Sequence, residues 1–134
     1  MSVFVDTSGL YALLVRSEDG HEEMVRAFGE VLQGGRPLCA TSYVLVETIA
    51  LLQHRIGLAA VRDLLDRVAP LLEIEWVSQE LHSSGVDRML REDRRTLSLV
   101  DCVSLEFMRA RGIDEVLGTD PHLEEAGYRL LRRS

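Results

Sequence analysis

Residues 3–15, which read VFVDTSGLYALLV, begin with three β-branched or aromatic residues and continue after Asp6 into a second apolar run. The first part predicts a short strand, and Leu10–Val15 predicts a helix, with a sharp turn between them at Asp6-Thr7-Ser8. A strand that passes directly into a helix is the usual opening of an α/β fold, in which strands and helices alternate.

The same alternation continues along the chain. Short strands are expected at 37–40, 72–77, 115–118 and 128–131, and helices at 20–33, 42–55, 58–69, 78–91, 98–111 and 121–126. The 58–69 helix should end before Pro70, because proline disrupts a helix interior. These elements predict an α/β fold around a mainly parallel sheet. Because no repeat, low-complexity segment or linker interrupts them, residues 1–134 are expected to form one domain.

The composition is that of an ordinary globular protein, with 46% hydrophobic and 28% charged residues. Every apolar stretch is interrupted well before the ~18 residues that a membrane-spanning helix needs. Residues 1–14 do not resemble a secretory signal, so a cytoplasmic location is expected. In that compartment Cys39 and Cys102, which both lie within apolar runs, are expected to be buried free thiols.

The net charge of −7 argues at face value against a nucleic-acid partner. Metal-dependent nucleases are an exception, because they concentrate acid at the site and bound cations reverse the local charge. All 15 basic residues are arginine, and the absence of lysine excludes two classes of protein. A phospho-accepting receiver domain depends on a lysine, and a P-loop enzyme needs Gly-Lys-Ser/Thr. A haloacid-dehalogenase-type phosphatase would need an acid at position 8, where Ser8 stands.

Three aspartates stand where either a helix cap or a ligand site would use them. Asp6 and Asp120 each follow a predicted strand and precede a helix, so each suits an N-cap or a site at the carboxyl ends of parallel strands. Pro121, directly after Asp120, is common at the first position of a capped helix. Asp101 stands three residues after Ser98, which is the spacing of a capping box, within an otherwise apolar segment.

Glu47 is a different case, because it lies inside the most apolar predicted helix. Its neighbours at helical spacing include Tyr43, Val44, Ala50 and Leu51. A carboxylate on such a face is costly unless it is paired or binds a metal. The structural alternatives are a buried arginine partner or a position at the rim of the buried face.

The four acids together favour a metal site more than any one of them does. Four converging carboxylates would repel one another without a cation. Hard divalent ions prefer oxygen ligands, and Mg²⁺ retains waters that leave room for a substrate phosphate. Asp6, Glu47, Asp101 and Asp120 are therefore the candidate catalytic and metal-binding residues.

Four short motifs carry a resemblance to a known family. They are VDTSGLYALL (5–14) with His21 downstream, VET (46–48), SLVDCVSL (98–105), and GTDPHL (118–123) followed by Gly127-Tyr128. In this order and spacing they resemble PIN-domain proteins, and in particular VapC-type toxin ribonucleases, from residue 3 to about 131. Two positions depart from the family pattern: Leu123 stands where phenylalanine is usual, and Pro121 where a polar residue is more frequent.

The resemblance implies a three-layer α/β/α sandwich around a parallel sheet. It also implies cleavage of RNA phosphodiester bonds that depends on Mg²⁺ or Mn²⁺, with Asp6, Glu47, Asp101 and Asp120 as the site. A VapB-type antitoxin would be the partner that covers this site, and a homodimer is expected. Two alternatives remain open, namely a housekeeping RNA-processing nuclease and a PIN-like binding module without catalysis.

Other side chains have two interpretations each. The hydroxyls of Thr7 and Ser8 suit orientation of a ligand or satisfaction of helix amides. The two interpretations of His122 are a side chain that approaches the site and an exposed histidine of a turn, and we expect the second. Guanidinium groups suit RNA phosphates, although a run of charge is usually a solvated surface. The candidate arginines form two clusters, Arg88, Arg91, Arg94 and Arg95 before the third motif and Arg129, Arg132 and Arg133 near the end of the chain.

Overall fold

The computed structural model describes residues 1–131 and contains one five-stranded sheet in which all neighbouring strands are parallel. The strands follow the order β3-β2-β1-β4-β5. Their bounds are β1 (Val3–Val5), β2 (Leu38–Thr41), β3 (Glu73–Glu75), β4 (Glu115–Leu117) and β5 (Arg129–Leu130). The predicted α/β class with a parallel sheet is confirmed.

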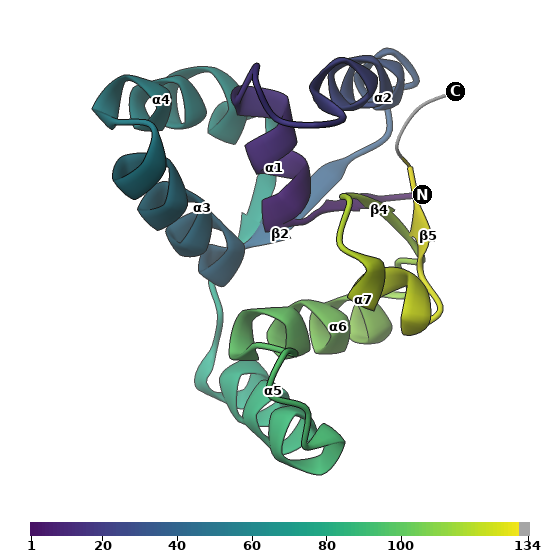
Figure 1. Ribbon diagram of the computed structural model, residues 1–134. Helices are drawn as coiled ribbons and strands as arrows, with labels where there is room; N and C mark the ends of the chain where they lie inside the picture. Colours follow the sequence, from purple (N-terminus) through teal and green to yellow (C-terminus); the bar gives the residue numbers. More distant parts are fainter. Residues whose placement is uncertain (132–134) are drawn as a thin grey trace.

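Helices cover both faces of this sheet, so the predicted three-layer sandwich is also confirmed. Figure 1 shows α1 and α2 on one side of the sheet and α6 on the other, with α5 packed outside α6. The helices are α1 (Thr7–Leu14), α2 (His21–Gln33), α3 (Ser42–Arg55), α4 (Leu58–Asp63), α5 (Gln79–Glu92), α6 (Leu99–Arg111) and α7 (Pro121–Glu125).

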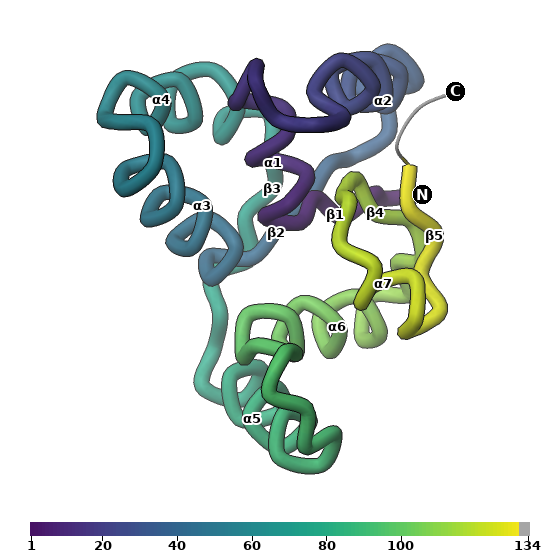
Figure 2. Tube along the Cα trace, viewed as in Figure 1, coloured from purple at the N-terminus to yellow at the C-terminus, as the bar shows by residue number. Residues whose placement is uncertain are grey.

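The central strand, β1, is the most enclosed part of the sheet, since Val3, Phe4 and Val5 are all buried. In Figure 2 it runs between β2 and β4. A parallel strand with helices over both of its faces has no solvated side, which is why its sequence is continuously apolar. Phe4 contacts Phe107 of α6, with 5.8 Å between the ring centroids.

The predicted helix starts are confirmed at three hydroxyl caps. The side chains of Thr41, Ser78 and Ser98 accept hydrogen bonds from backbone N–H groups in the first turns of α3, α5 and α6. At the start of α2, Nδ1 of His21 lies 2.7 Å from the carbonyl oxygen of Ala12, which joins α2 to α1. These local bonds fix where the chain enters each helix.

The helix expected at 58–69 does end before Pro70, but only its first part, α4, is α-helical. After α4 the chain makes a π-helical turn, η1 (Leu64–Val68), and then a 3₁₀ turn, η2 (Ala69–Leu71), that contains Pro70. Proline is tolerated in the first turn of a new helix, where its missing N–H would have no partner in any case.

Cys39 and Cys102 are buried free thiols, as expected. Within residues 1–131, no helix is both long enough and apolar enough to cross a membrane.

Candidate active site

The strand order creates a crevice between β1 and β4. From β1 the chain moves outward through α1 and α2 to β2, and then to β3 at the edge of the sheet. It then crosses back through α5 and α6 to β4, on the other side of β1. Ligands bind beyond the carboxyl ends of strands at such a reversal, because neighbouring connections diverge there.

All four predicted carboxylates line one pocket at this place. The pocket has a volume of about 360 Å³. Its lining residues are Asp6, Thr7, Ser8, Tyr11, Glu18, Glu47, Leu51, Arg55, Ser98, Asp101 and Asp120. The structure therefore brings together acids from four separate segments of the chain. Metal binding and catalysis by these residues stay predictions.

Asp6 directly follows β1 and is the N-cap of α1, with only 3% of its surface exposed. Its Oδ2 accepts hydrogen bonds from the backbone N–H of Ser8 at 3.3 Å and from the Ser8 hydroxyl at 2.9 Å. Burial raises the pKa of Asp6 to about 6 against these hydrogen bonds, and the charges of Asp101 and Asp120 raise it further. The ionised side chain is therefore held in an unfavourable environment.

Ser8 connects Asp6 to the loop after β4. Its oxygen accepts a hydrogen bond of 2.9 Å from the backbone N–H of Thr119, the residue before Asp120. The start of α1 can lie this close to the end of β4 because Gly9 has no side chain. A Cβ at Gly9 would lie 2.1 Å from the carbonyl oxygen of Leu117. A Cβ at Gly118 would likewise lie 3.0 Å from the Ser8 oxygen. The two glycines allow the α1 and β4 segments to pack tightly at the pocket.

Asp101 forms the predicted capping box at the start of α6. Its Oδ2 accepts a bond from the Ser98 backbone N–H, and the Ser98 hydroxyl accepts one from the Asp101 backbone N–H, both at 3.1 Å. Burial raises the pKa of Asp101 despite these bonds, and the neighbouring charge of Asp120 acts in the same direction.

Asp120 caps α7, and its partner is His122. Oδ1 of Asp120 accepts a bond from the backbone N–H of His122 at 3.0 Å and lies 2.9 Å from Nδ1 of the same residue. Our expectation of an exposed histidine was wrong: the His122 side chain is 24% exposed and pairs with Asp120. One potential ligand atom each from Asp101, Asp120 and His122 lie within 4.8 Å of one another.

Helix capping and pocket lining are therefore not alternatives for the three aspartates, because each one does both. In every case a single carboxylate oxygen makes the cap: Oδ2 in Asp6, Oδ2 in Asp101 and Oδ1 in Asp120. The second oxygen of each has no hydrogen-bond partner in the described part of the chain. The caps orient the three side chains, and they leave three oxygens for a ligand.

The apolar sequence around Glu47 suggested an enclosed side chain. In the structure Glu47 is only half-buried on α3. The buried face of α3 carries Val44, Thr48 and Leu52, and Glu47 stands at its rim. No ion pair or hydrogen bond to its carboxylate occurs within residues 1–131. The rim explains why its charge is tolerated. Its relevance to the site rests on its position in the acidic pocket.

Sequence reasoning missed Arg55, Tyr11 and Glu18, which also line the pocket. The signal for Arg55 was its helical spacing of eight residues from Glu47. The arginines chosen instead mostly have acidic partners: Arg88 pairs with Glu92 and Glu106, Arg94 with Glu125, and Arg129 with Glu115. Arg132 and Arg133 lie outside the described residues.

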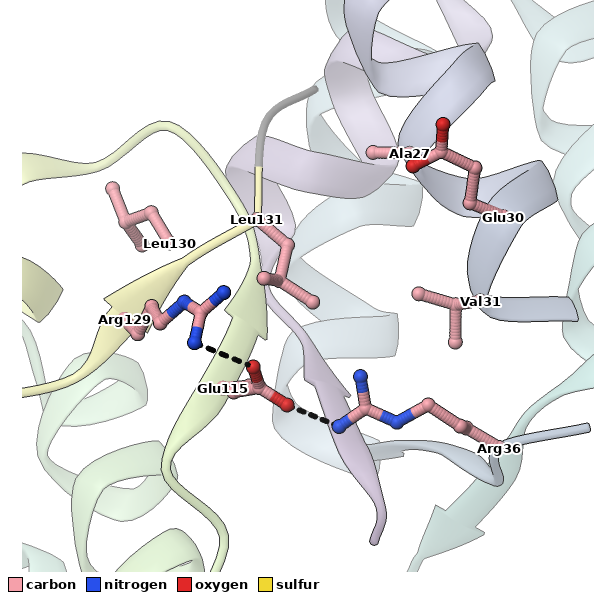
Figure 3. Close-up of a pocket in the computed structure, with 8 residues that line it drawn as sticks. All are labelled: Ala27, Glu30, Val31, Arg36, Glu115, Arg129, Leu130 and Leu131. Atoms are coloured by element: carbon pink, nitrogen blue, oxygen red, sulfur yellow. Dashed lines mark hydrogen bonds and ion pairs between the residues drawn. The ribbon is translucent and has the colours of Figure 1, made fainter. Parts of the chain in front are cut away.

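A second pocket of about 370 Å³ lies toward the amino ends of the strands. In Figure 3, Glu115 bridges the guanidinium groups of Arg36 and Arg129 there. These charges largely satisfy one another, so this pocket lacks the excess of acid that distinguishes the site at the carboxyl ends.

The family model of the PIN domain matches residues 3–127. The chain belongs to the PIN-domain family. This PIN-domain chain is 32% identical over 128 residues to the 23S rRNA-specific endonuclease VapC20 of Mycobacterium tuberculosis, covering 94% of this chain and 95% of VapC20. That identity over nearly the whole length places it among the VapC-type members of the family, as the motifs predicted.

Solved structures give the same result for the PIN fold. The crystal structure of Mycobacterium tuberculosis VapC20, described as a Sarcin-Ricin loop cleaving toxin, matches with a TM-score of 0.81 and 30% identity, over 97% of this chain and 98% of that one. FitAcB from Neisseria gonorrhoeae matches with a TM-score of 0.68 at 12% identity, over 98% and 96% of the two chains. DNA-bound VapBC from Salmonella typhimurium matches with a TM-score of 0.66 at 16% identity, over 97% of each chain. The last two show the shared fold alone.

Proposed function

We propose that this PIN-domain protein is a metal-dependent ribonuclease that cleaves RNA phosphodiester bonds. The observation that carries the proposal is the single pocket that Asp6, Glu47, Asp101 and Asp120 line together. Helix capping does not explain why the acids converge. Each aspartate uses only one oxygen for its cap, and a cap does not require another acid nearby. Their convergence raises the energy of the ionised pocket, and a divalent cation reverses that effect.

The residues present fit Mg²⁺ or Mn²⁺. Their donor set consists of carboxylate oxygens, the hard ligands that these ions prefer, and Asp6, Glu47, Asp101 and Asp120 would hold the ion. When bound, it lowers the pKa of a coordinated water and offsets negative charge at the phosphate.

The remaining side chains orient this set. Ser8 holds one oxygen of Asp6, Ser98 one oxygen of Asp101, and His122 one oxygen of Asp120. The buried hydroxyl of Thr7 has no hydrogen-bond partner within residues 1–131 and lines the same pocket.

The biological role that we propose is the toxin of a type II toxin–antitoxin system. The support is the 32% identity to VapC20, a 23S rRNA-specific endonuclease whose crystal structure is described as that of a toxin. The partner is then a VapB-type antitoxin that covers the acidic pocket. We further propose that residues 1–134 form one domain, that two copies associate as a homodimer, and that the protein acts in the cytoplasm.

Cleavage assays on purified 23S rRNA, with Mg²⁺, Mn²⁺ or EDTA, test this function. The wild type should release discrete fragments only with metal, and D6N and E47Q should be folded by circular dichroism but inactive. Cleavage by either variant at the wild-type rate contradicts the assignment of the site.

Calorimetric titration with Mn²⁺ separates a nuclease from a binding module that has lost catalysis, because such a module gives no site-specific heat. Growth arrest on expression, relieved by D6N or by co-expression of a small upstream gene, separates a toxin from a housekeeping nuclease.

A further inference from the structure

The acidic pocket has a single cationic side chain among the described residues that line it. Asp6, Glu18, Glu47, Asp101 and Asp120 contribute five carboxylates, and Arg55 contributes the only guanidinium. RNA is a polyanion, so most of this surface repels it, and bound metal compensates only near its ligands. Among the described residues that line the pocket, Arg55 is the one whose positive charge attracts a phosphate.

Arg55 lies at a distance from the metal-binding candidates along the same helix. Glu47, Leu51 and Arg55 all line the pocket, and their spacing of four residues places them on one face of α3. Eight residues of α-helix span about 12 Å, which equals the axial length of a few stacked nucleotides at about 3.4 Å each. The backbone separation from Glu47 suits a phosphate that flanks the cleavage site.

Tyr11 orients the guanidinium of Arg55. The Arg55 Cζ atom lies 5.6 Å from the centroid of the Tyr11 ring, which also lines the pocket from α1. No carboxylate within residues 1–131 pairs with Arg55, whereas Arg88 and Arg94 both have acidic partners. A guanidinium that is held over an aromatic ring by a cation–π contact makes no ion pair with the ring, so its N–H donors remain for a phosphate.

We propose that Arg55, which lies over the Tyr11 ring, binds a backbone phosphate of the RNA beside the cleavage site and so positions the strand across the four carboxylates. This inference rests on the proposed ribonuclease function. A structural role also needs consideration, because Arg55 stands in the last turn of α3, where a cation interacts favourably with the helix dipole. The test must separate the two roles.

Arg62 offers a control for the loss of one exposed positive charge. It lies on α4, is exposed, and does not line the acidic pocket. R55Q and R62Q remove the same charge, the first inside the pocket and the second outside it. In a D6N background, which cannot cleave, binding of a fluorescein-labelled single-stranded RNA of random sequence is measured by anisotropy at several salt concentrations. Random sequence is sufficient because phosphate contacts do not depend on sequence.

We expect R55Q to weaken RNA binding by about tenfold and to lower the slope of log affinity against log salt by about one, while R62Q changes neither. R55K should keep the salt slope but lose part of the affinity, since lysine lacks the planar fork. Y11F should bind as the parent does, and Y11L should be weaker. In the wild-type background, R55Q should raise KM more than it lowers kcat and leave calorimetric Mn²⁺ binding unchanged.

Equal RNA affinities and salt slopes for R55Q and R62Q overturn the inference and leave the ribonuclease assignment intact. Loss of Mn²⁺ binding or a large fall in melting temperature in R55Q would instead show a structural role. Absence of RNA binding by the D6N parent, together with absence of cleavage by the wild type, would refute the proposed function itself.

Discussion

The Ser8 hydroxyl donates a 2.9 Å hydrogen bond to Oδ2 of Asp6, so the second residue of α1 fixes the carboxylate that follows β1. The same hydroxyl accepts the backbone N–H of Thr119. We predict that S8A lowers Mn²⁺ affinity by about 10- to 100-fold, the usual effect of removing a group that orients a metal ligand. Cleavage should fall in parallel. Isothermal calorimetry and the 23S rRNA assay measure the two effects.

S17A serves as the control for S8A, because Ser17 is exposed and does not line the pocket. It should match the wild type in both measurements. An S8A variant with wild-type Mn²⁺ affinity would show that the backbone cap alone is sufficient to orient Asp6.

Two glycine substitutions should change the free energy of unfolding in opposite directions, because only one of them disturbs the contact between α1 and β4. A Cβ at Gly9 would lie 2.1 Å from the backbone oxygen of Leu117, so G9A should destabilise the protein by at least ~2 kcal/mol, as overpacking against a backbone does. A Cβ at Gly29, inside α2, would meet nothing within 4 Å beyond its own helix backbone, so G29A should stabilise by about 0.5–1 kcal/mol through helix propensity. Urea unfolding compares them. Equal stabilities would contradict the close approach.

The fold and most of the site could be predicted because their signals are local. Three β-branched or aromatic residues before Asp6 indicate a buried strand, and the Ser98–Asp101 spacing indicates a capping box. The sequence could not separate capping from ligand binding, because the first oxygen of an aspartate serves the cap and the second remains for a ligand. That distinction depends on which side chains meet across the β1–β4 crevice, which is a long-range property.

Glu47, His122 and Arg55 show what local patterns leave out. The rotation of α3 about its axis is set by packing against α1, α4 and α6. It places Glu47 at the rim of the buried face and Arg55 over Tyr11. His122 pairs with Asp120 because α7 starts where β4 leaves the sheet. The helical spacing of Arg55 from Glu47 indicates a shared helix face, but the side chains that each of these residues meets depend on how the helices pack.

The raised pKa of Asp6, about 6, predicts how the stability of the metal-free protein depends on pH. The folded state holds this proton more tightly than the unfolded chain, whose aspartate titrates near its usual value, so stability falls as pH rises from about 4 through 6. Ionised Asp6 then costs up to about 3 kcal/mol at neutral pH. D6N keeps an oxygen for the Ser8 bonds and removes the charge.

We therefore expect D6N to be more stable than the wild type in EDTA at pH 7.5, with the difference much reduced at pH 4.5, while RNA cleavage is lost. Mn²⁺ should raise the melting temperature of the wild type more than that of D6N. Urea unfolding at the two pH values and thermal melts with and without Mn²⁺ measure this. If D6N is less stable than the wild type at both pH values, the ionised carboxylate of Asp6 does not destabilise the wild-type protein.

Glu106 joins α5 to α6, since its carboxylate accepts hydrogen bonds from Arg88 at 2.9 Å and from Arg109 at 2.8 Å. Burial opposes its ionisation, but the hydrogen bonds and charges of Arg109 and Arg88 outweigh burial and hold the pKa of Glu106 below its usual value.

This lowered pKa stabilises the fold above the usual pKa of a glutamate, and the contribution is lost as pH falls through the lowered value. E106Q leaves the largely buried Arg88 without its closest partner, so it should cost roughly 2–3 kcal/mol at neutral pH. E125Q removes the exposed partner of Arg94 and should cost less than about 1 kcal/mol. Urea unfolding at pH 7 and pH 4 compares the two variants, and the difference between wild type and E106Q should shrink at the lower pH. Equal costs for E106Q and E125Q would show that the α5–α6 contact depends on apolar packing, such as Gly85 against Val103, and not on this buried ion pair.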